Sequence, residues 1–353
     1  MATTSNYRFS VSDPETVVRF EPRLPAQFGR AANRVVVFDA NTARLFGTAV
    51  SDPVLLEDRD GAKHWASVER VLLAAHERGM DRGGEIIGIG GGAVCDVAAF
   101  AASIYLRGVR LTLVPTTVTA MVDAALGGKT GINLGSGKNL VGTFYPAHRL
   151  IVVPHVVSHL STSDYLDGLA EVIKTAMLGD GRLFGMLECR RDEVLARRPA
   201  LVEEYVRRCL AVKARFVAHD LREELGTAVR PDGTSRAFLN LGHTFAHALE
   251  SASGFAWSHG AAVAWGLGRA MRLGRLLGIV DPGYAQRVIR LLRAYGYRLC
   301  AVEVSGDRIL SAMWADKKRS GDELRFVVQR GLEQTEMRAV PAAAVREALR
   351  DES

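Results

Sequence analysis

Four polar residues in one short segment have the types and spacing of a metal- and anion-binding site. Arg236, Asn240, His243 and His247 follow one another at intervals of four, three and four residues. On a helix, these intervals place all four side chains on one face. The residues between them are mostly apolar, which predicts a buried helix with a polar stripe. Leaving such groups unpaired costs on the order of 2–7 kcal/mol each. A metal ion with an anionic ligand would satisfy them; a stripe that faces water is the alternative.

A carboxylate on a second apolar segment could complete a metal site. Glu171 and Lys174 lie three residues apart in residues 168–178, where little other polar surface is available. Glu171 is therefore a candidate metal ligand together with His243 and His259. One carboxylate and two imidazoles that leave coordination positions open suit Zn²⁺ or a similar divalent cation. The alternatives are a surface ion pair worth about 0.3 kcal/mol and hydrogen-bonded core histidines.

A glycine-rich segment between an expected strand and an expected helix could bind a nucleotide. Within residues 87–102, Gly88, Gly90 and Ala93 fit the pattern GxGxxA. Glycines there allow close backbone approach, and free N–H groups at a helix start attract phosphate. Asp39, which ends an earlier expected strand, is suitably placed to receive ribose hydroxyls. The alternative is a tight turn that only packs a helix on a strand.

A second glycine-rich segment, residues 114–139, carries groups suited to anions. Asp123, Lys129, Lys138 and Asn139 lie here, after a strand end where ligands of parallel sheets bind. Two lysines and glycine-freed amides suit phosphate or carboxylate groups. A surface loop with solvated lysines is the alternative. Further basic candidates, each weak alone, are Arg107, Lys213, Lys317 and Lys318.

Short apolar runs alternate with helical patterns early in the chain, and long helical patterns follow. The alternation predicts βαβ units and a parallel sheet. Strands are expected at residues 34–39, 85–89, 110–114 and 150–153, and early helices at 65–78 and 94–105. Later helices are expected at 165–178, 200–217, 236–251, 260–277 and 282–295, with a small strand at 324–328. We therefore expect an α/β domain over residues 1–155 and an all-helical domain over residues 156–353.

Composition narrows the class of protein. The 353 residues are 48% hydrophobic and 24% charged, enough for two globular cores. The net charge is +6, but the arginines of residues 182–208 are mixed with acids, which indicates solvated helices and no nucleic-acid partner. No apolar run reaches the roughly 18–20 residues of a membrane helix. The first residues lack a secretory pattern and the four cysteines are scattered, so we expect a cytoplasmic protein.

Seven ordered motifs resemble the sugar phosphate cyclases, and most closely the 3-dehydroquinate synthase family. They are GGGAVCDVAAFAASIYLRG, VPTTVTAMVDAALGGKTGIN, GKNLVGTFYPA, GLAEVIK, LNLGHTFAHALE, SHGAAVAWG and ADKKRSGDELRFV. The resemblance implies a Rossmann-like α/β domain that binds NAD, followed by a helical metal- and substrate-binding domain. It also implies that both ligands meet in a cleft between the two.

The resemblance assigns roles residue by residue. Zn²⁺ or Co²⁺ would be held by Glu171, His243 and His259. The implied NAD contacts are Asp39, Asp60, Lys63, Gly91, Gly92, Asp96, Thr116, Thr117 and Lys138. The implied substrate contacts are Arg107, Lys129, Asn139, Lys213, Arg236, Asn240, Lys317 and Lys318. Asp123, Lys174 and His247 would act in catalysis. Arg107 would reach the substrate phosphate of a neighbouring subunit, which implies a homodimer.

The implied reaction converts 3-deoxy-D-arabino-heptulosonate 7-phosphate to 3-dehydroquinate with release of phosphate. Departures from the family pattern keep alternatives open: Asp60 replaces a glutamate, residues 159–161 read His-Leu-Ser in place of Thr-Leu-Pro, and the loop 226–235 is longer. One alternative is a related cyclase, either an amino-dehydroquinate synthase or a valiolone-forming enzyme that uses sedoheptulose 7-phosphate. A second is a metal-dependent polyol or alcohol dehydrogenase, which shares the two-domain plan.

Overall fold

The chain forms two compact units, each built from two separate stretches of sequence. The computed structural model describes residues 5–9, 15–24, 33–46, 50, 52–135, 137–218, 220–223, 228–230, 233–301, 303–316 and 323–350. Unit 1 comprises Met1–Tyr165 and Arg197–Glu224, and unit 2 comprises Leu166–Ala196 and Leu225–Ser353. The expected division at residue 155 assumed a single crossing, whereas the chain passes between the units three times.

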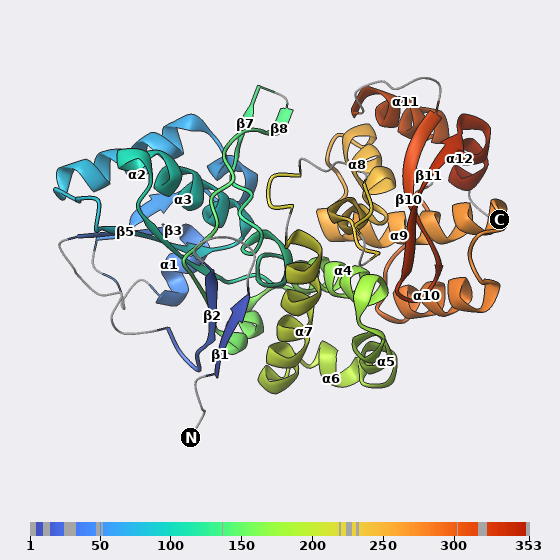
Figure 1. Cartoon of the computed structure of the whole chain (residues 1–353), viewed down its shortest axis with the longest axis horizontal. Helices are drawn as coiled ribbons and strands as arrows, with labels where there is room; N and C mark the ends of the chain where they lie inside the picture. The colour runs from blue at the N-terminus through green and yellow to red at the C-terminus, as the bar shows by residue number, and fades with distance from the viewer. Residues whose placement is uncertain are drawn as a thin grey trace. The chain divides into compact units, whose positions relative to one another are not determined.

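Unit 1 is organised around a seven-stranded sheet with the order β1-β2-β9-β6-β5-β3-β4 (Figure 1). The strands are β1 (Ser5–Phe9), β2 (Thr16–Phe20), β3 (Arg34–Asp39), β4 (Val54–Leu56), β5 (Glu85–Gly90), β6 (Arg110–Pro115) and β9 (Arg149–Val152). All neighbours are parallel except β1 and β2, which pair antiparallel. The four predicted strands are confirmed as β3, β5, β6 and β9. Strands β1, β2 and β4 were not predicted.

Helices cover both faces of this sheet, as fully buried parallel strands require. They are α1 (Ala40–Phe46), α2 (Trp65–Glu77) and α3 (Gly92–Ile104). On one face Gly88 lets α3 approach, because a Cβ there would lie 2.7 Å from the Cβ of Ala98. On the other face Phe38 and Ile87 join a buried cluster against which Phe46 of α1 packs. Alternate residues of each strand therefore serve opposite layers.

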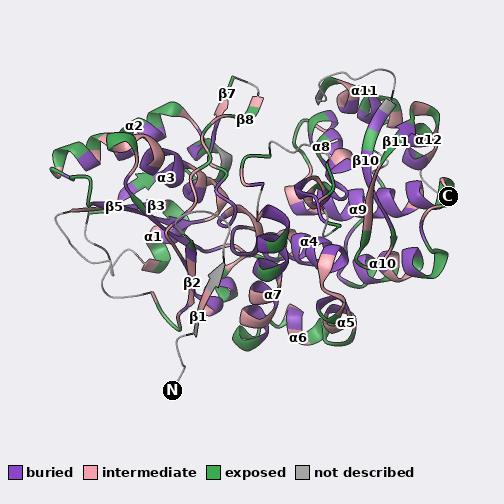
Figure 2. Ribbon diagram, viewed as in Figure 1, coloured by how far each residue is buried: buried purple, intermediate pink, exposed green. Residues whose placement is uncertain are grey.

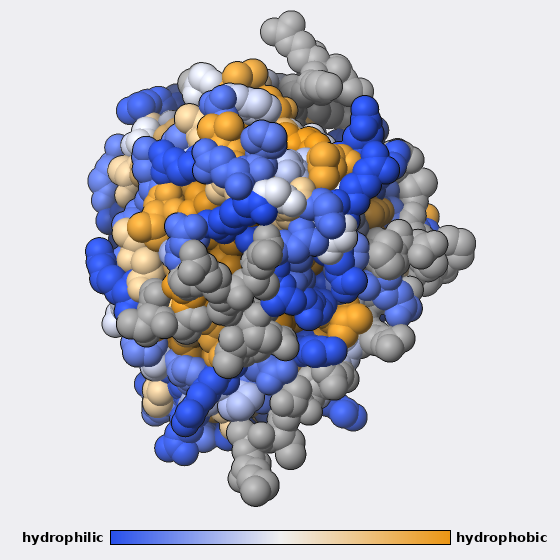
Figure 3. Space-filling model, turned by 90° about the vertical axis from the view of Figure 1, so that its left-hand side faces the viewer, coloured by the Kyte–Doolittle hydropathy of each residue, from blue (hydrophilic) through white to orange (hydrophobic). Residues whose placement is uncertain are grey.

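The remaining elements of unit 1 lie in the connections between these strands and helices and after the last strand. They are η3 (Arg59–Ala62), η4 (Tyr105–Arg107), the π-helical turn η5 (Ala120–Ala124), β7 (Ile132–Leu134), β8 (Gly137–Val141), η6 (Pro154–His159) and α7 (Pro199–Val217). Strands β7 and β8 form a separate antiparallel hairpin. Hydrophilic side chains cover much of the face of unit 1 seen in Figure 3, with apolar ones between them.

Unit 2 is mainly helical. Its elements are α4 (Thr162–Gly179, whose first turn is counted with unit 1), α5 (Gly181–Cys189), α6 (Arg191–Leu195), η7 (Arg236–Asn240), α8 (His243–Ala252), α9 (His259–Leu276), α10 (Pro282–Ala294), α11 (Gly306–Asp316) and α12 (Ala342–Leu349). The antiparallel hairpin β10 (Glu323–Gly331) and β11 (Gln334–Pro341) contains the small strand predicted at residues 324–328, whereas β11 was not predicted in this otherwise helical part. None of the described helices is both long and apolar enough to cross a membrane.

Helix α9 forms the centre of unit 2, and most of its residues are buried (Figure 2). A helix that is apolar on nearly all sides belongs in a core. Its Trp265 is among the largest fully buried side chains and packs edge-on against Phe245 of α8, with ring centroids 6.2 Å apart. Helix α9 thereby holds the start of α8 in place.

The predicted continuous helix over residues 236–251 is wrong. Residues Arg236–Asn240 form the 3₁₀ turn η7, and α8 begins only at His243. Between them Gly242 has a φ of +78°, in the left-handed region that glycine adopts readily. A Cβ on Gly242 would lie 2.9 Å from the backbone nitrogen of Leu267, so α9 also requires a glycine here. The polar stripe is therefore split between two elements.

Close approach of α8 to α9 should make Gly266 intolerant of a side chain. A Cβ there would overlap the carbonyl oxygen of Gly242. We expect Gly266→Ala to destabilise the protein by about 1–3 kcal/mol in urea unfolding, because two helix backbones must separate. Gly185→Ala is the matched control, since Gly185 lies within α5 with nothing within 4 Å of the added Cβ. The control should gain about 0.5–1 kcal/mol from helix propensity. Equal effects of both substitutions would contradict this packing.

Candidate active site

Three predicted metal ligands from three helices of unit 2 come together. Glu171 lies in α4, and His243 and His259 are the first residues of α8 and α9. The Nε2 atoms of His243 and His259 lie 3.4 Å and 3.2 Å from the same oxygen, Oε1 of Glu171. Ligand atoms of all three residues lie within 4.8 Å of one another. The predicted triad is thus assembled around one point.

The start of helix α9 positions the imidazole of His259. Ser258, the residue before α9, donates a 2.6 Å hydrogen bond from Oγ to Oδ1 of Asp167 in α4. A Cβ on Gly260 would overlap the backbone carbonyl of Asp167, so this glycine lets α9 begin directly against α4. Glu171 follows Asp167 by one helical turn. These contacts place His259 beside Glu171.

The carboxylate at the centre is fully buried and charged. Burial raises the pKa of Glu171, but the Lys174 ammonium and His243 outweigh it and hold this pKa well below its ordinary value. Lys174 is itself buried, and its Nζ lies 2.6 Å from Oε2 of Glu171. Oε2 nevertheless accepts no hydrogen bond of good geometry from the described residues. An ionised, buried carboxylate whose Oε1 faces two imidazole nitrogens fits a divalent cation of the zinc class.

The two histidines differ in their surroundings. Burial, followed by the nearby Lys174 charge, lowers the pKa of His243, so its ring is neutral at pH 7. Its Nδ1 lies 3.3 Å from the carbonyl oxygen of Leu241, which leaves Nε2 toward Glu171. For His259, burial acts in the opposite direction to hydrogen bonds with Glu171 and Glu250, which raise its pKa to about 10. His243 is therefore ready to coordinate, whereas His259 must first lose a proton.

His247 lies one turn after His243 on the exposed side of the cluster. Its ring centroid is 5.2 Å from that of His243 and 6.3 Å from that of His259. An exposed imidazole beside a metal site can exchange protons with solvent and with a bound ligand. Arg236 is buried at the start of η7 and Asn240 is exposed at its end. Both thus precede α8, off the helix that carries the histidines.

The glycine motif of unit 1 combines packing with an open helix start. A Cβ on Gly90 would lie 2.6 Å from the Cβ of Val94, so this glycine, like Gly88, serves packing. Gly91 caps α3 and Gly92 is its first residue, and the nearest contacts to a Cβ on either are 3.3 Å and 3.6 Å away. Gly88 and Gly90 therefore pack the helix on the strand, as the alternative in the sequence analysis expected. The next two leave the N–H groups of the helix start approachable by an anion.

A buried lysine contacts two other predicted site residues near this helix start. Lys63 donates hydrogen bonds from Nζ to Oδ2 of Asp96 in α3 and to Oδ1 of Asn139 in β8. Asn139 has a φ of +56° and its N–H donates to Oδ1 of Asn133. The structure therefore brings Lys63, Asp96 and Asn139 into one polar cluster.

Three other predicted nucleotide contacts shape the strand ends. Asp39 at the end of β3 accepts a 2.7 Å hydrogen bond at Oδ1 from the N–H of Thr42 and so caps α1. Thr116 is buried after β6, with its N–H bonded to the carbonyl of Gly90. Oγ1 of Thr117 accepts from the N–H of Ala120 at 3.2 Å. Through these hydrogen bonds the three residues hold the loops at the carboxyl edge of the sheet, where ligands bind.

Two of the predicted substrate lysines contact carboxylates. Lys213 of α7 is buried and pairs with both Oδ1 and the carbonyl oxygen of Asp123 in η5. Lys129 lies 2.5 Å from Oε1 of Glu223, with both side chains largely exposed. Each lysine is therefore placed where it meets an anionic oxygen.

The other predicted residues are placed as follows. Arg107 is exposed at the end of η4 with a φ of +68°, between Leu106 and Gly108, which also have positive φ. Lys138 is exposed on β8. The side chain of Asp60 and the whole of Lys317 and Lys318 lie outside the described residues, as do parts of the loop 226–235.

Sequence reasoning missed two glutamates that contact predicted site residues, one in each unit. Glu250 is buried in α8, with Oε1 3.4 Å from Nδ1 of His259. Glu250 could have been predicted from the sequence, because it follows His243 by seven residues and shares its helix face. Glu223 carries no such signal, since it lies outside any helix or strand and its pairing with Lys129 spans two distant segments.

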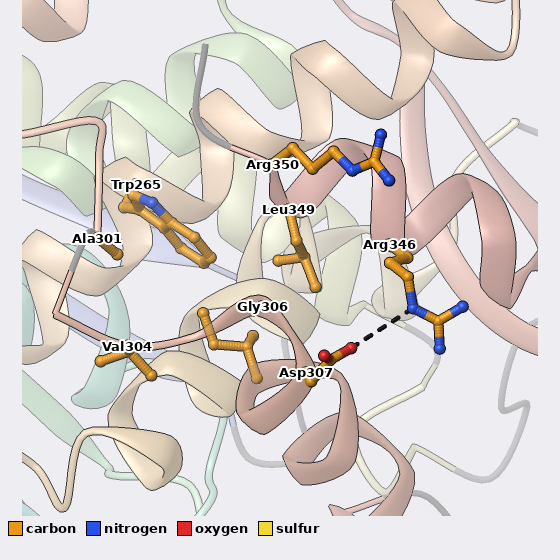
Figure 4. A pocket seen from close by; sticks show the side chains of 9 residues that line it. Trp265, Ala301, Val304, Gly306, Asp307, Arg346, Leu349 and Arg350 are labelled. Atoms are coloured by element: carbon orange, nitrogen blue, oxygen red, sulfur yellow. Dashed lines mark ion pairs between the residues drawn. The ribbon is translucent and has the colours of Figure 1, made fainter. Parts of the chain in front are cut away.

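A separate hollow of about 480 Å³ in unit 2 involves none of the predicted site residues (Figure 4). Trp265, Val304 and Leu349 supply its apolar surface. Arg346 at its rim turns to Asp307, with 3.5 Å between Nε and Oδ1. Its lining therefore adds no ligand to the histidine cluster.

Comparison with known proteins matches most of the chain to one family. Residues 53–167 match the family described as 3-dehydroquinate synthase N-terminal, and residues 168–319 match 3-dehydroquinate synthase C-terminal. A 3-dehydroquinate synthase of Streptomyces avermitilis is 41% identical over 274 residues, covering 77% of this chain and 72% of the relative. That of Bordetella pertussis is 34% identical over 340 residues, covering 96% and 88%.

Solved structures share the fold. A 2-epi-5-epi-valiolone synthase of Streptomyces hygroscopicus, with NAD⁺ and Zn²⁺ bound, gives a TM-score of 0.83 at 24% identity, covering 94% of this chain and 95% of the other. A 2-deoxy-scyllo-inosose synthase, complexed with carbaglucose-6-phosphate, NAD⁺ and Co²⁺, gives 0.82 at 22% identity, covering 98% and 99%. These likenesses confirm the predicted α/β plus helical architecture.

Binding of a divalent cation should release about one proton. His259 has a pKa of about 10 without metal, whereas His243 is neutral and Glu171 ionised near pH 7, so only His259 must be deprotonated. The apparent affinity for Zn²⁺ should therefore rise about tenfold per pH unit between pH 7 and 9. Titration calorimetry in buffers of different ionisation enthalpy counts the protons, with His243→Ala as a control that should lose binding. Release of no proton, or of two, would contradict this assignment.

Proposed function

Since this chain belongs to the 3-dehydroquinate synthase family, we propose that it converts 3-deoxy-D-arabino-heptulosonate 7-phosphate to 3-dehydroquinate and inorganic phosphate. The observation that carries the proposal is the cluster of Glu171, His243 and His259, whose ligand atoms lie within 4.8 Å of one another. Identities of 34–41% to curated 3-dehydroquinate synthases support the same reaction. The net reaction is an elimination and cyclisation without net oxidation, so a catalytic nucleotide has to be regenerated in each turnover.

Two cofactors follow from the residues present. NAD⁺ is proposed to lie at the start of α3 beside Gly91 and Gly92, where it would accept a hydride from the substrate and later return it. A divalent cation, Zn²⁺ or Co²⁺, would be held by Glu171, His243 and His259 and would polarise the substrate oxygen that is oxidised. Structures with this fold carry NAD⁺ with Zn²⁺ or Co²⁺, which supports both proposals.

Residues around the metal ligands are suited to proton transfer and charge balance. His247 is exposed beside the cluster and is the imidazole that we propose as a proton carrier. Lys174 keeps Glu171 ionised from 2.6 Å and is the buried cation that we propose to stabilise anionic oxygen. Lys213 contacts Asp123 in unit 1, and this pair is proposed to orient hydroxyl groups of the substrate.

The basic residues are proposed to read the two anionic ends of the substrate. Lys129, Arg107 and Asn139 would contact the phosphate, and Arg236 would bind the carboxylate through its bidentate guanidinium. Lys129 is more than half exposed, which supports this because its ammonium can be reached by a ligand. We keep Lys317 and Lys318 as further candidates from the family resemblance.

The assembly and location are proposals of the same kind. We propose a homodimer in which Arg107, exposed on η4, reaches the substrate of the second subunit. None of the four cysteines, all of which lie within the described residues, forms a disulfide bond, and Cys189 and Cys300 are exposed; both facts support the proposed cytoplasmic location.

The reaction can be tested by product analysis. Purified protein with NAD⁺ and Zn²⁺ or Co²⁺ should release phosphate from 3-deoxy-D-arabino-heptulosonate 7-phosphate and form 3-dehydroquinate, without net NADH. Arg236→Lys should lower kcat/KM for this carboxylate substrate by about 10–100-fold, since a bidentate charged contact is worth about 1.5–3 kcal/mol.

Sedoheptulose 7-phosphate, which has no carboxylate, is the control substrate. Cyclisation of this sugar in preference to the carboxylate substrate would support a valiolone-forming enzyme and overturn the proposal. Accumulation of NADH with a polyol would instead indicate a dehydrogenase.

A further inference from the structure

His259 contacts a different carboxylate through each of its ring nitrogens. Nε2 lies 3.2 Å from Oε1 of Glu171, on the side where the triad converges. Nδ1 lies 3.4 Å from Oε1 of Glu250, on the opposite edge of the ring. An imidazole held at both nitrogens has a fixed ring orientation, because rotation about its side-chain bonds would break both contacts.

Glu250 is placed for this contact by α8. It follows the triad residue His243 by seven residues, or two helical turns, and therefore points to the same side of the helix. Glu250 is only 8% exposed, and its side chain is opposite the start of α9, where His259 lies. Burying a carboxylate is costly unless it is paired. The pairing with His259 offsets this cost.

We propose that Glu250 is a positioning residue that orients His259 for metal binding and strengthens its Nε2 as a ligand. This inference rests on the proposed metal-dependent function and assigns a role to a residue outside the triad. In the metal-bound state, Nδ1–H of His259 would donate a hydrogen bond to the carboxylate of Glu250, and the lone pair of Nε2 would be free to bind the ion on the Glu171 side. A carboxylate behind a ligating histidine fixes its tautomer and increases its basicity.

The two proposed metal-binding histidines then differ in the group that contacts their Nδ1 atom. His243 has a backbone carbonyl, that of Leu241, 3.3 Å from its Nδ1. His259 has an anionic carboxylate in the corresponding place. The carboxylate adds negative charge next to a cation site that also has the Lys174 ammonium close by, 2.6 Å from Glu171. Glu250 thus raises the attraction of the site for a divalent ion, which the neutral carbonyl cannot do.

Direct ligation by Glu250 is the competing arrangement. Glu250, His247 and His259 also have possible ligand atoms within 4.8 Å of one another. One ion cannot bind both nitrogens of the same ring, so an ion there would have to leave Nε2 of His259 unused. The triad around Glu171 uses that nitrogen and includes the fully buried carboxylate, so the geometry favours Glu250 as a positioning residue.

Metal affinity tests this role without depending on turnover. Glu250→Gln keeps the shape of the side chain but removes its charge, and Glu250→Ala removes the contact as well. Dissociation constants for Zn²⁺ are measured by competition with a chelator, and coordination is followed through the absorption spectrum of bound Co²⁺. We expect both variants to bind metal more weakly, by about 10–100-fold for Glu250→Ala and less for Glu250→Gln. The ¹⁵N chemical shifts of His259 should show Nδ1–H in the metal-bound wild type.

Glu188→Gln is the matched control. Glu188 is also a glutamate of unit 2 with a basic partner, Arg287, at 2.6 Å, but it is not among the residues of either possible metal group. This control should bind metal as the wild type does. Unchanged affinity and Co²⁺ spectrum in folded Glu250→Gln would overturn the inference while leaving the proposed function intact.

The remaining outcomes are also decisive. Complete loss of bound Co²⁺ in folded Glu250→Gln would indicate that Glu250 is itself a ligand and would overturn the positioning role. If the wild type binds no metal at all, or if His243→Ala binds it equally well, the proposed metal centre fails and the inference fails with it. Should Glu250→Ala not fold, the near-isosteric Glu250→Gln still decides.

Discussion

The structure of unit 2 depends on one fully buried carboxylate, that of Glu171. An ionised group in a protein interior is tolerated only with strong compensation. Lys174 and the imidazoles of His243 and His259 supply it, within 2.6–3.4 Å. Three helices must therefore converge on one point, and glycines at the helix contacts, such as Gly266, let their backbones come close enough. The same ionised carboxylate that is costly to bury makes the cluster suited to a divalent cation once His259 has lost its proton.

In unit 1, the carboxyl edge of the parallel sheet carries backbone N–H groups that can bind an anion and a lysine that is held in place. Gly88 lets α3 pack closely against β5, and α3 consequently starts at the sheet edge with its N–H groups available. Lys63 joins Asp96 and Asn139 close to that start. Charged side chains are thus held by one another before any ligand arrives, so little side-chain ordering remains to be done on binding.

The sequence predicted the central strands and the metal triad because both leave local or chemically specific signals. Buried parallel strands such as β5 read as apolar runs, and the types of Glu171, His243 and His259 limit what they can do. The helix break at Gly242 was missed because a glycine within a helical pattern does not reveal its φ; the approach of α9 decides it. The pairing of Lys129 with Glu223 was missed because it joins segments far apart in sequence. Glu250 shows an intermediate case, since its helix face was readable but its partner on α9 was not.

The most direct test of this account is anomalous diffraction from crystals of the protein grown with Zn²⁺, recorded on both sides of the zinc absorption edge. We predict one strong peak bounded by Oε1 of Glu171 and the Nε2 atoms of His243 and His259, at about 2.0–2.2 Å from each. A peak elsewhere, or full-strength catalysis by crystals and solutions free of any metal, would contradict the claim that these three side chains form a metal centre.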